Sequence, residues 1–411
     1  MQFAGLSSPG AIAAAYELVS PLGISYYAHA SALSPAFYQA LLDRYWRRSE
    51  FKPSRDQRQT INRFNAHVLG EQYTKEASRL YPRTKDESKK RNNDFILNDR
   101  VHEAEYSRLK SPPEPAHKFD VTLEEDNFTE EKFKVFQNYQ QVIHKDDPAE
   151  NTKKSFTRFL CDSPLRRQTE TRPDGTKKRL GSFHQCYRLD GELVAVGVLD
   201  LLPECVSSVY FMYHESIHKL SPGKLGALHE IALASEEGYR WWYPGYYIHS
   251  CPKMRYKMDY APQYILDPVT LSWDPLDKTV LALLDKAPYV SLSQCRANEA
   301  GTQDADGKDD SPPGQDAVAE DDSDSDEDGI DGSLFDANMP GIPTLAEMED
   351  VSMDGIRVLV KDALMLYRVS DLVGWRETTI HEWPRMKARM AELVAAMGID
   401  SPSKLCLDLT R

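Results

Sequence analysis

The stretch from Gly181 to Pro268 carries the densest set of side chains that could do chemistry. Carboxylates and imidazoles can accept a proton from a nucleophile, and phenols can donate a hydrogen bond to a developing oxyanion. The candidates for proton transfer are Glu230, His229, Asp259 and His249. The candidate hydrogen-bond donors are Tyr210, Tyr246 and Tyr247, beside backbone amides. These residue types are suited to acid–base chemistry, with the choice of base left open.

Each of these candidates also has a purely structural interpretation. Glu230 lies about 160° from Leu228 on a helical wheel, away from the apolar stripe, so it could equally be a solvated carboxylate on a helix. His229 and His249 could be ordinary structural histidines. The residue types alone do not decide between the two interpretations.

A second set of side chains could bind anions. The segment CPKMRYKMDY interleaves cations with aromatic rings, which suits a substrate carboxylate or the stacked, phosphate-rich end of an RNA, and equally a basic surface loop. Between Lys153 and Arg188 ten Lys or Arg stand against three acids, a balance typical of a phosphate footprint or of a solvated face. The substrate-binding candidates are Lys253, Arg255, Tyr256, Lys257 and Tyr247, and the RNA-binding candidates are Arg166, Arg167, Lys177, Lys178, Arg179, Arg47 and Arg48.

The elements that position these side chains follow from turn chemistry and periodicity. Asp190-Gly191 separates two β-rich runs, 183–189 and 192–199, and predicts a tight hairpin. A third strand is expected over 206–213. Ser221-Pro222-Gly223 opens a helix that Gly238 closes, and a fourth strand is expected over 241–249. The apolar face predicted for that helix comprises Leu225, Leu228, Ile231, Ala232 and Ser235.

Charge and composition bound the rest of the chain. The net charge is −14, but residues 304–331 hold 13 acids and one lysine, so the remainder carries only about −2. This acidic run predicts a disordered linker from about 301 to 340. No apolar run approaches the roughly 18 residues of a membrane span. Six cysteines without a CxxC pair indicate reduced thiols, as in the cytoplasm or nucleus.

Helices are further expected over 34–42, 56–69 and 129–144, the last capped by Thr129. A strand is expected over 119–123, and residues 73–110 read as a charged connector, helical or partly disordered. Beyond the acidic run, 356–369 and 383–397 are expected to form an amphipathic helix pair packed on the core.

Several blocks of the sequence resemble arginyl-tRNA–protein transferases. The blocks are FTRFLCDSPL (156–165), GSFHQCYRLDGELVAVGVLDLLP (181–203), SSVYF (207–211), PGKLGALHEIALA (222–234) and GYYIHSCPKMRYKMDYAPQYILDP (245–268). Upstream, SYYAHA (25–30), LLDRYWRRS (41–49) and FKPSRDQRQTINRFN (51–65) resemble the same family's N-terminal region. The resemblance implies an N-acetyltransferase-like α/β (α+β) mixed sheet with flanking helices. It also implies transfer of arginine from charged tRNA to proteins that begin with Asp, Glu or oxidised Cys.

The chain departs from the family pattern in two places. A CxxC pair is expected before Ser25 and a Cys-Cys pair between Ser49 and Phe51, and neither is present. Both absences look like clean excisions, as a faulty gene model or a splice form would give. The resemblance therefore implies that the family's cysteine metal or iron–sulfur site does not form here, so we expect no cofactor, with Arg-tRNA as co-substrate. Smaller departures lie at His229 and Gly226, where many relatives have Arg and Ser.

These observations predict five segments. They are a truncated N-terminal domain (1–75), a charged connector with strand and helix (76–155), an acyltransferase-like catalytic domain (156–290), an acidic linker (296–340) and C-terminal helices (341–411). Two other functions stay open. The first is a coenzyme A-dependent N-acyltransferase, which the weak Gly223-Lys224-Leu225-Gly226 loop disfavours because it lacks the RxxGxG pattern. The second is an inactive adaptor lacking the cysteine segments.

Overall fold

A computed structural model of the 411-residue chain describes most of the sequence. The described residues are 12–16, 26–30, 33–42, 51–149, 151–172, 175–245, 249, 252–267, 269–270, 272–287, 290–301, 333–337, 342–360 and 365–409. Most of the predicted acidic linker, together with Arg47, Arg48, Tyr246 and Tyr247, lies outside these residues. Among the described residues, no helix is long and apolar enough to cross a membrane.

The chain divides into two compact units, described separately here. Unit 1 comprises Met1–Ala14, His29–Leu266 and Pro275–Leu281, and unit 2 comprises Ala15–Ala28, Asp267–Asp274 and Ala282–Arg411. The candidate site residues lie in unit 1. The five predicted segment boundaries stay predictions.

Unit 1 is built on a mixed sheet in the order β3-β5-β6-β7-β8, with β4 paired to β5. Neighbouring strands are antiparallel except β7 and β8, which are parallel and joined by a helical crossover. The expected α+β acyltransferase-like mixed sheet is confirmed. The strands are β3 (Phe119–Glu125), β4 (Gln168–Thr171), β5 (Lys177–Leu189), β6 (Glu192–Leu201), β7 (Cys205–Tyr213) and β8 (Trp241–Tyr243).

The predicted hairpin is confirmed as β5 and β6. Its turn residues Asp190 and Gly191 have φ angles of 55° and 86°, the left-handed conformation that a type I′ turn requires. The third and fourth predicted strands are β7 and β8. The fourth is shorter than expected, because β8 ends at Tyr243 and residues 246–248 lie outside the described part of the chain.

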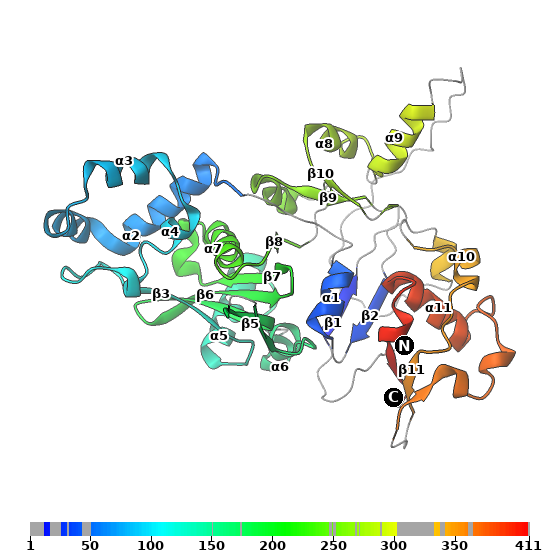
Figure 1. The fold of residues 1–411 in the computed structure, drawn as a ribbon. Helices are drawn as coiled ribbons and strands as arrows, with labels where there is room; N and C mark the ends of the chain where they lie inside the picture. The colour runs from blue at the N-terminus through cyan, green and yellow to red at the C-terminus, as the bar shows by residue number, and fades with distance from the viewer. Residues whose placement is uncertain are drawn as a thin grey trace. The chain divides into compact units, whose positions relative to one another are not determined.

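One face of the sheet is covered by α7 (Pro222–Glu236), the helix predicted from Ser221-Pro222-Gly223. A second layer, α2 (Arg55–Leu80) and α4 (Leu97–Val101), packs on α7 (Figure 1). The helix expected over 56–69 is the first part of α2, which is interrupted at Gly70 (φ 74°). The charged connector also contains a helix, α3 (Lys85–Asn93).

The opposite face of the sheet is covered by α5 (Glu130–Tyr139) and α6 (Lys153–Phe156), and each helix continues as one π-helical turn (Figure 1). Thr129 caps α5 as predicted, because its side chain accepts a hydrogen bond from the backbone N–H of Lys132. Alternate residues of β6 face the two layers. Val196 and Val198 pack under α5 and α6, whereas Leu199 and Leu201 pack under α7.

Several shorter elements complete the described chain. The helix expected over 34–42 is α1 (Pro35–Leu42). The other short elements are β1 (Ile12–Tyr16), β2 (Tyr26–Ala30), β9 (Tyr264–Leu266), β10 (Trp273–Pro275), α8 (Lys278–Leu284) and α9 (Leu292–Gly301).

Unit 2 contains a small three-stranded sheet and two helices. The strands are β11 (Arg357–Leu359), β12 (Tyr367–Arg368) and β13 (Cys406–Asp408), and the helices are α10 (Leu345–Glu349) and α11 (Met386–Met397). The helix predicted over 356–369 is wrong. Val358 pairs with Leu407 in β13 and with Tyr367 in β12, so long-range strand pairing overrides the local pattern. The second predicted helix is confirmed as α11, which begins after Pro384.

Candidate active site

Glu230 is enclosed at the centre of unit 1. It lies in the middle of α7 and is 1% exposed. Its Oε2 accepts a hydrogen bond of 2.7 Å from the indole Nε1 of Trp242 in β8. The expectation that Glu230 could be a solvated carboxylate is wrong, because the sheet covers one side of α7 while α2 and α4 cover the other. The same covering buries α7 from Leu225 to Ala234, whereas Ser235, predicted on the apolar face, is exposed.

Burial changes the proton affinity of Glu230. Desolvation raises the pKa of its carboxyl from 4.5 to about 7, against smaller lowering effects of the hydrogen bonds from Trp242 and Ser208. A carboxyl group with a pKa near neutrality can both accept and return a proton at physiological pH. Perturbed carboxyls of this kind gather at functional sites.

The backbone of the sheet makes room for this carboxylate. A β-bulge in β7 shifts the register between Val198 and Leu199 of β6, beside Ser208, whose side chain bonds to Glu230. Opposite, a Cβ on Gly197 would lie 3.3 Å from Glu230 Oε1. Glycine therefore lets the strand approach the carboxylate closely.

A cavity of about 660 Å³ is lined in part by Trp242 and by Ile231, the residue after Glu230 in α7. This volume is within the range of small-molecule sites. Its wall combines aromatic rings with cations, and Arg240 stacks over Trp241 with the guanidinium carbon 4.9 Å from the ring centre. Among the described lining residues, Asp94 is the one acid. The lining residues that carry the argument are Lys52, Arg58, Asp94, Phe95, Arg240 and Trp242.

The other predicted proton-transfer residues lie apart from Glu230. His229 is 1% exposed. Its pKa is lowered to about 3, mainly by desolvation and to a smaller extent by the nearby His102, so its imidazole is neutral. Asp259 is exposed at the end of a 3-10 helix, Pro252–Asp259. Tyr210 donates a 3.0 Å hydrogen bond to Gln140 on the α5 face of the sheet. His249 is half-buried.

Part of the predicted substrate-binding cluster lies near Glu230. Tyr256 is 48% exposed. The pKa of its phenol is nevertheless raised, mainly by desolvation and to a smaller extent by the charge of Glu230. Gly245 lies between Lys257 and β7. A Cβ built on Gly245 would be 3.5 Å from Lys257 Nζ and 3.8 Å from the carbonyl oxygen of Ser208, so the Lys257 ammonium is close to β7. Lys253 and Arg255 are in the same 3-10 helix, but their side chains are outside the described residues.

The predicted RNA-binding cations differ in their surroundings. Arg167 pairs with Glu125 and Asp126 at 3.1 and 3.2 Å, and Arg179 pairs with Glu237. Arg166 and Lys177 have exposed side chains.

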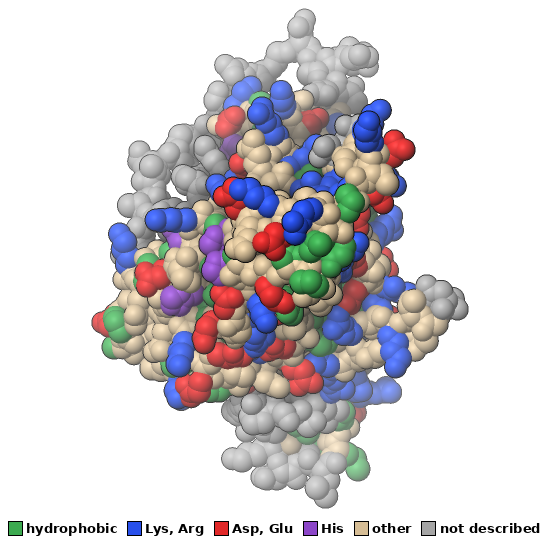
Figure 2. Space-filling model, turned by 90° about the vertical axis from the view of Figure 1, so that its left-hand side faces the viewer, with side chains coloured by type: hydrophobic (Ala, Val, Ile, Leu, Met, Phe, Trp, Pro, Cys, Tyr) green, Lys and Arg blue, Asp and Glu red, His purple; other side chains and the backbone are tan. Residues whose placement is uncertain are grey.

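Lys178 is 7% exposed, and its ammonium donates to the carbonyl oxygens of Pro203 and Gly238. Figure 2 shows that basic and acidic side chains are interspersed on the face it draws. A role for these cations in RNA binding stays a prediction.

The sequence analysis did not find most of the cavity. Asp94, Phe95 and Arg240 carry no local signal, because three segments far apart in sequence form the wall. Lys52 and Arg58 lie in the block FKPSRDQRQTINRFN, but nothing in that block marks them as cavity residues. A weak signal existed for one further pair, His102 and Glu105, whose i, i+3 spacing places both at one turn after α4.

A mixed sheet covered by helices, with a buried near-neutral carboxyl beside a cationic and aromatic cavity, defines an α+β protein of the acyltransferase-like class. The family model described as Arginine-tRNA-protein transferase, C terminus, matches residues 131–267. This part of the chain is therefore similar to the C-terminal region of arginyl-tRNA–protein transferases, and the matched segment holds Glu230 and Trp242.

Several curated proteins are similar to the same part of the chain. Arginyl-tRNA–protein transferase 1 of Arabidopsis thaliana is 42% identical over 185 residues, covering 43% of this chain and 29% of the relative. The Drosophila melanogaster protein of the same name is 43% identical over 169 residues, covering 40% and 34%. An aspartate/glutamate leucyltransferase of Pseudomonas fluorescens is 36% identical over 141 residues, covering 34% and 53%. The matches with the first two span about a third of those relatives.

Proposed function

We propose that this chain transfers arginine from the 3′ ester of arginyl-tRNA to the α-amino group of proteins that begin with Asp, Glu or oxidised Cys, marking them for ubiquitin-dependent degradation. The observation that carries the proposal is the Glu230 carboxyl, buried in the family-matched domain with a pKa of about 7. Arginyl-tRNA is the co-substrate, and the proposed chemistry uses no cysteine metal site. The proposed location is the cytoplasm or nucleus, in keeping with the free thiols of the five described cysteines.

The reaction needs only a modest base. An α-amine has a pKa near 8, so roughly a tenth is free base at neutral pH. The amine nitrogen attacks the ester carbonyl carbon, the bond to the ribose oxygen breaks, and one proton must pass from nitrogen to that oxygen. In the proposed mechanism Glu230 accepts this proton through the half-buried Ser208 hydroxyl and returns it to the leaving oxygen.

The cavity supplies contacts that suit the aminoacyl end of a tRNA. Aromatic rings can stack on the terminal bases, and Lys52, Arg58 and Arg240 can pair with phosphates. Asp94 can pair with the guanidinium of the arginyl group. Lys253, Arg255 and Lys257 are proposed to bind the acidic side chain of the acceptor.

The start of α7 offers little to coenzyme A. Ser221 has a φ of 59°, and Lys224, the cation in the first turn, lies with its Nζ 2.5 Å from Asp56 Oδ2. A cation already paired with a carboxylate is a poor partner for a pyrophosphate. This contact supports charged tRNA as the donor.

The test measures single-turnover transfer of labelled arginine from charged tRNA to an Asp-initiated peptide across pH 5.5–9. Glu230→Gln keeps the size and the hydrogen-bond acceptor for Trp242 but cannot take a proton. We expect it to lower the rate by about 10²- to 10⁴-fold, the usual contribution of a general base. The wild-type rate should rise through pH 7 as Glu230 ionises.

The matched control is Asp200→Asn. Asp200 is also buried and desolvation raises its pKa to about 7, but it bonds to Ser182 in β5 and not to Trp242. This control should keep the wild-type rate. Equal rates for Glu230→Gln and Asp200→Asn would remove Glu230 from the mechanism.

A further inference from the structure

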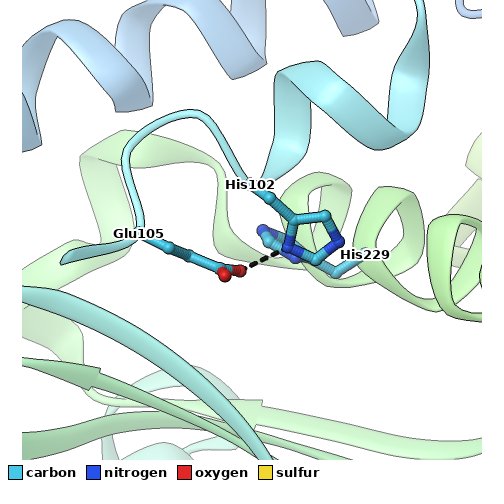
Figure 3. Close-up of side chains that lie close together, drawn as sticks. All are labelled: His102, Glu105 and His229. Atoms are coloured by element: carbon cyan, nitrogen blue, oxygen red, sulfur yellow. Dashed lines mark hydrogen bonds and ion pairs between the residues drawn. The ribbon is translucent and has the colours of Figure 1, made fainter. Parts of the chain in front are cut away.

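A cluster of His102, Glu105 and His229 lies between α4 and α7 (Figure 3). His102 follows the last residue of α4, Glu105 precedes a 3-10 turn, and His229 is in the middle of α7. One ring nitrogen of each histidine and one carboxylate oxygen of Glu105 all lie within 4.8 Å of one another. Three potential metal ligands from two separate segments therefore converge on one point.

His229 has an unsatisfied ring nitrogen. The residue is 1% exposed, and its buried Nδ1 has no hydrogen-bond partner among the described residues. Its ring packs edge-on against His102, Tyr187 and Phe119, with centroids 5.5, 5.3 and 6.2 Å apart. A buried nitrogen without a hydrogen-bond partner is unfavourable. Ring packing does not satisfy this nitrogen of His229, whereas a metal ion could.

The surroundings of His102 match those of a metal-bound histidine. Its Nδ1 contacts Glu105 Oε1, and its Nε2 lies 3.1 Å from Glu236 Oε2. In metal sites the second ring nitrogen commonly donates to a carboxylate, which fixes the tautomer and orients the ring. Glu236 is placed to accept that bond, because it is two turns after His229 on the same face of α7.

The charges favour a divalent cation. Two carboxylates, Glu105 and Glu236, face two histidines that are neutral when they bind a metal. Arg108 also pairs with Glu105, because its Nε lies 3.8 Å from the other carboxylate oxygen. A divalent ion would balance the two carboxylates and would occupy the orphaned nitrogen at the same time.

We propose that His102, Glu105 and His229 bind a Zn²⁺ ion, with Glu236 as the hydrogen-bond partner of His102. Two imidazoles and one carboxylate are a common zinc ligand set, and tetrahedral zinc places its ligand atoms roughly 3.3 Å apart. Small rotamer changes therefore close the cluster around the ion. The ion would join the segment after α4 to α7, next to Glu230.

The experiment uses the full chain, stripped with EDTA and titrated with Zn²⁺ and, in parallel, with Co²⁺ as a spectroscopic probe. We expect one equivalent to bind, with visible Co²⁺ absorption of a nitrogen and oxygen site and no thiolate charge-transfer band. Zn²⁺ should raise the melting temperature by about 2 °C or more. His229→Gln should weaken binding by at least about a hundredfold, and Glu236→Gln by about 10- to 100-fold.

A second histidine pair of the chain supplies the matched control. His67 and His117 stack with centroids 4.9 Å apart, and His117 Nδ1 lies 2.7 Å from Asp190 Oδ2. Figure 2 shows histidine side chains gathered at the surface, where adventitious metal could bind. His117→Gln should leave the tight equivalent unchanged.

Three results would overturn the proposal. They are the absence of tight Zn²⁺ binding, binding that is lost in His117→Gln but kept in His229→Gln, and a thiolate band in the Co²⁺ spectrum. If His229→Gln fails to fold, the partly exposed Glu236→Gln and the wild-type melting shift decide the question.

Discussion

The ionisation of Glu230 should be visible in the stability of the protein, independently of catalysis. Its folded-state pKa of about 7 exceeds its ordinary value of 4.5 because the carboxyl is desolvated. Between these values the native protein holds a proton that the unfolded chain has released, so the free energy of unfolding falls as pH rises. Below pH 4.5 the effect vanishes, and above pH 7 it is complete.

The magnitude follows from the two pKa values. Each pKa unit corresponds to roughly 1.4 kcal/mol, so full ionisation costs about 3 kcal/mol, and about 2 to 3 kcal/mol of this is lost between pH 5 and pH 8. Glu230 is 1% exposed, so little solvent screening applies. Glu230→Gln is neutral at every pH and keeps an acceptor for Trp242. Relative to wild type it should become more stable as pH rises, by that amount.

The assay is urea unfolding of wild type and variant at pH 5, 6, 7 and 8, followed by intrinsic fluorescence. Comparing the two proteins at each pH cancels the titration of groups that they share. Asp200→Asn should give the same sign of effect, because Asp200 is also buried with a raised pKa, yet it should not affect transfer. Parallel curves for Glu230→Gln and wild type would refute the buried, high-pKa carboxyl.

Three further predictions concern packing and binding. Gly226→Ala should lower the free energy of unfolding in urea by roughly 1–3 kcal/mol, because a Cβ there would overlap the ring of Phe211. Gly223→Ala should cost less, because no atom of the described residues lies within 4 Å of its Cβ, and equal costs would contradict this reasoning. Asp94→Asn should lower kcat/KM for arginyl-tRNA by about tenfold, the value of one charge-assisted hydrogen bond, and an unchanged value would remove it from the arginyl site. Lys253→Ala should raise KM for an Asp-initiated peptide by about tenfold without changing KM for the tRNA, and unchanged transfer would exclude a role for Lys253 in acceptor binding.

Local chemistry predicted the central elements well. Asp190-Gly191 specifies its own turn, and Ser221-Pro222-Gly223 and Gly238 mark the ends of α7, so neighbouring residues decide these structures. The helix expected over 356–369 failed for the opposite reason. Residues 357–359 and 367–368 of this segment form strands because of partners as far away as Leu407, and no local pattern contains that information.

The candidate site shows the same limit. The sequence identifies Glu230 as a titratable residue but not its burial. A helical wheel assumes that one face of the helix is exposed to solvent, and α7 has no exposed face over most of its length. Its raised pKa depends on α2 and α4, which are distant in sequence. The cavity near it joins residues such as Arg58, Asp94 and Trp242 from three segments, so it exists only in the folded chain.

The most direct test of the proposed function is transfer of labelled arginine from charged tRNA to two peptides that differ only in an N-terminal Asp or Ala. The account predicts transfer to the Asp peptide, little transfer to the Ala peptide, and loss of the Asp signal in Glu230→Gln with retention in Asp200→Asn. Absence of transfer to either peptide by the folded wild-type chain would contradict the proposed activity. Equal transfer to both would contradict recognition of an acidic N-terminus.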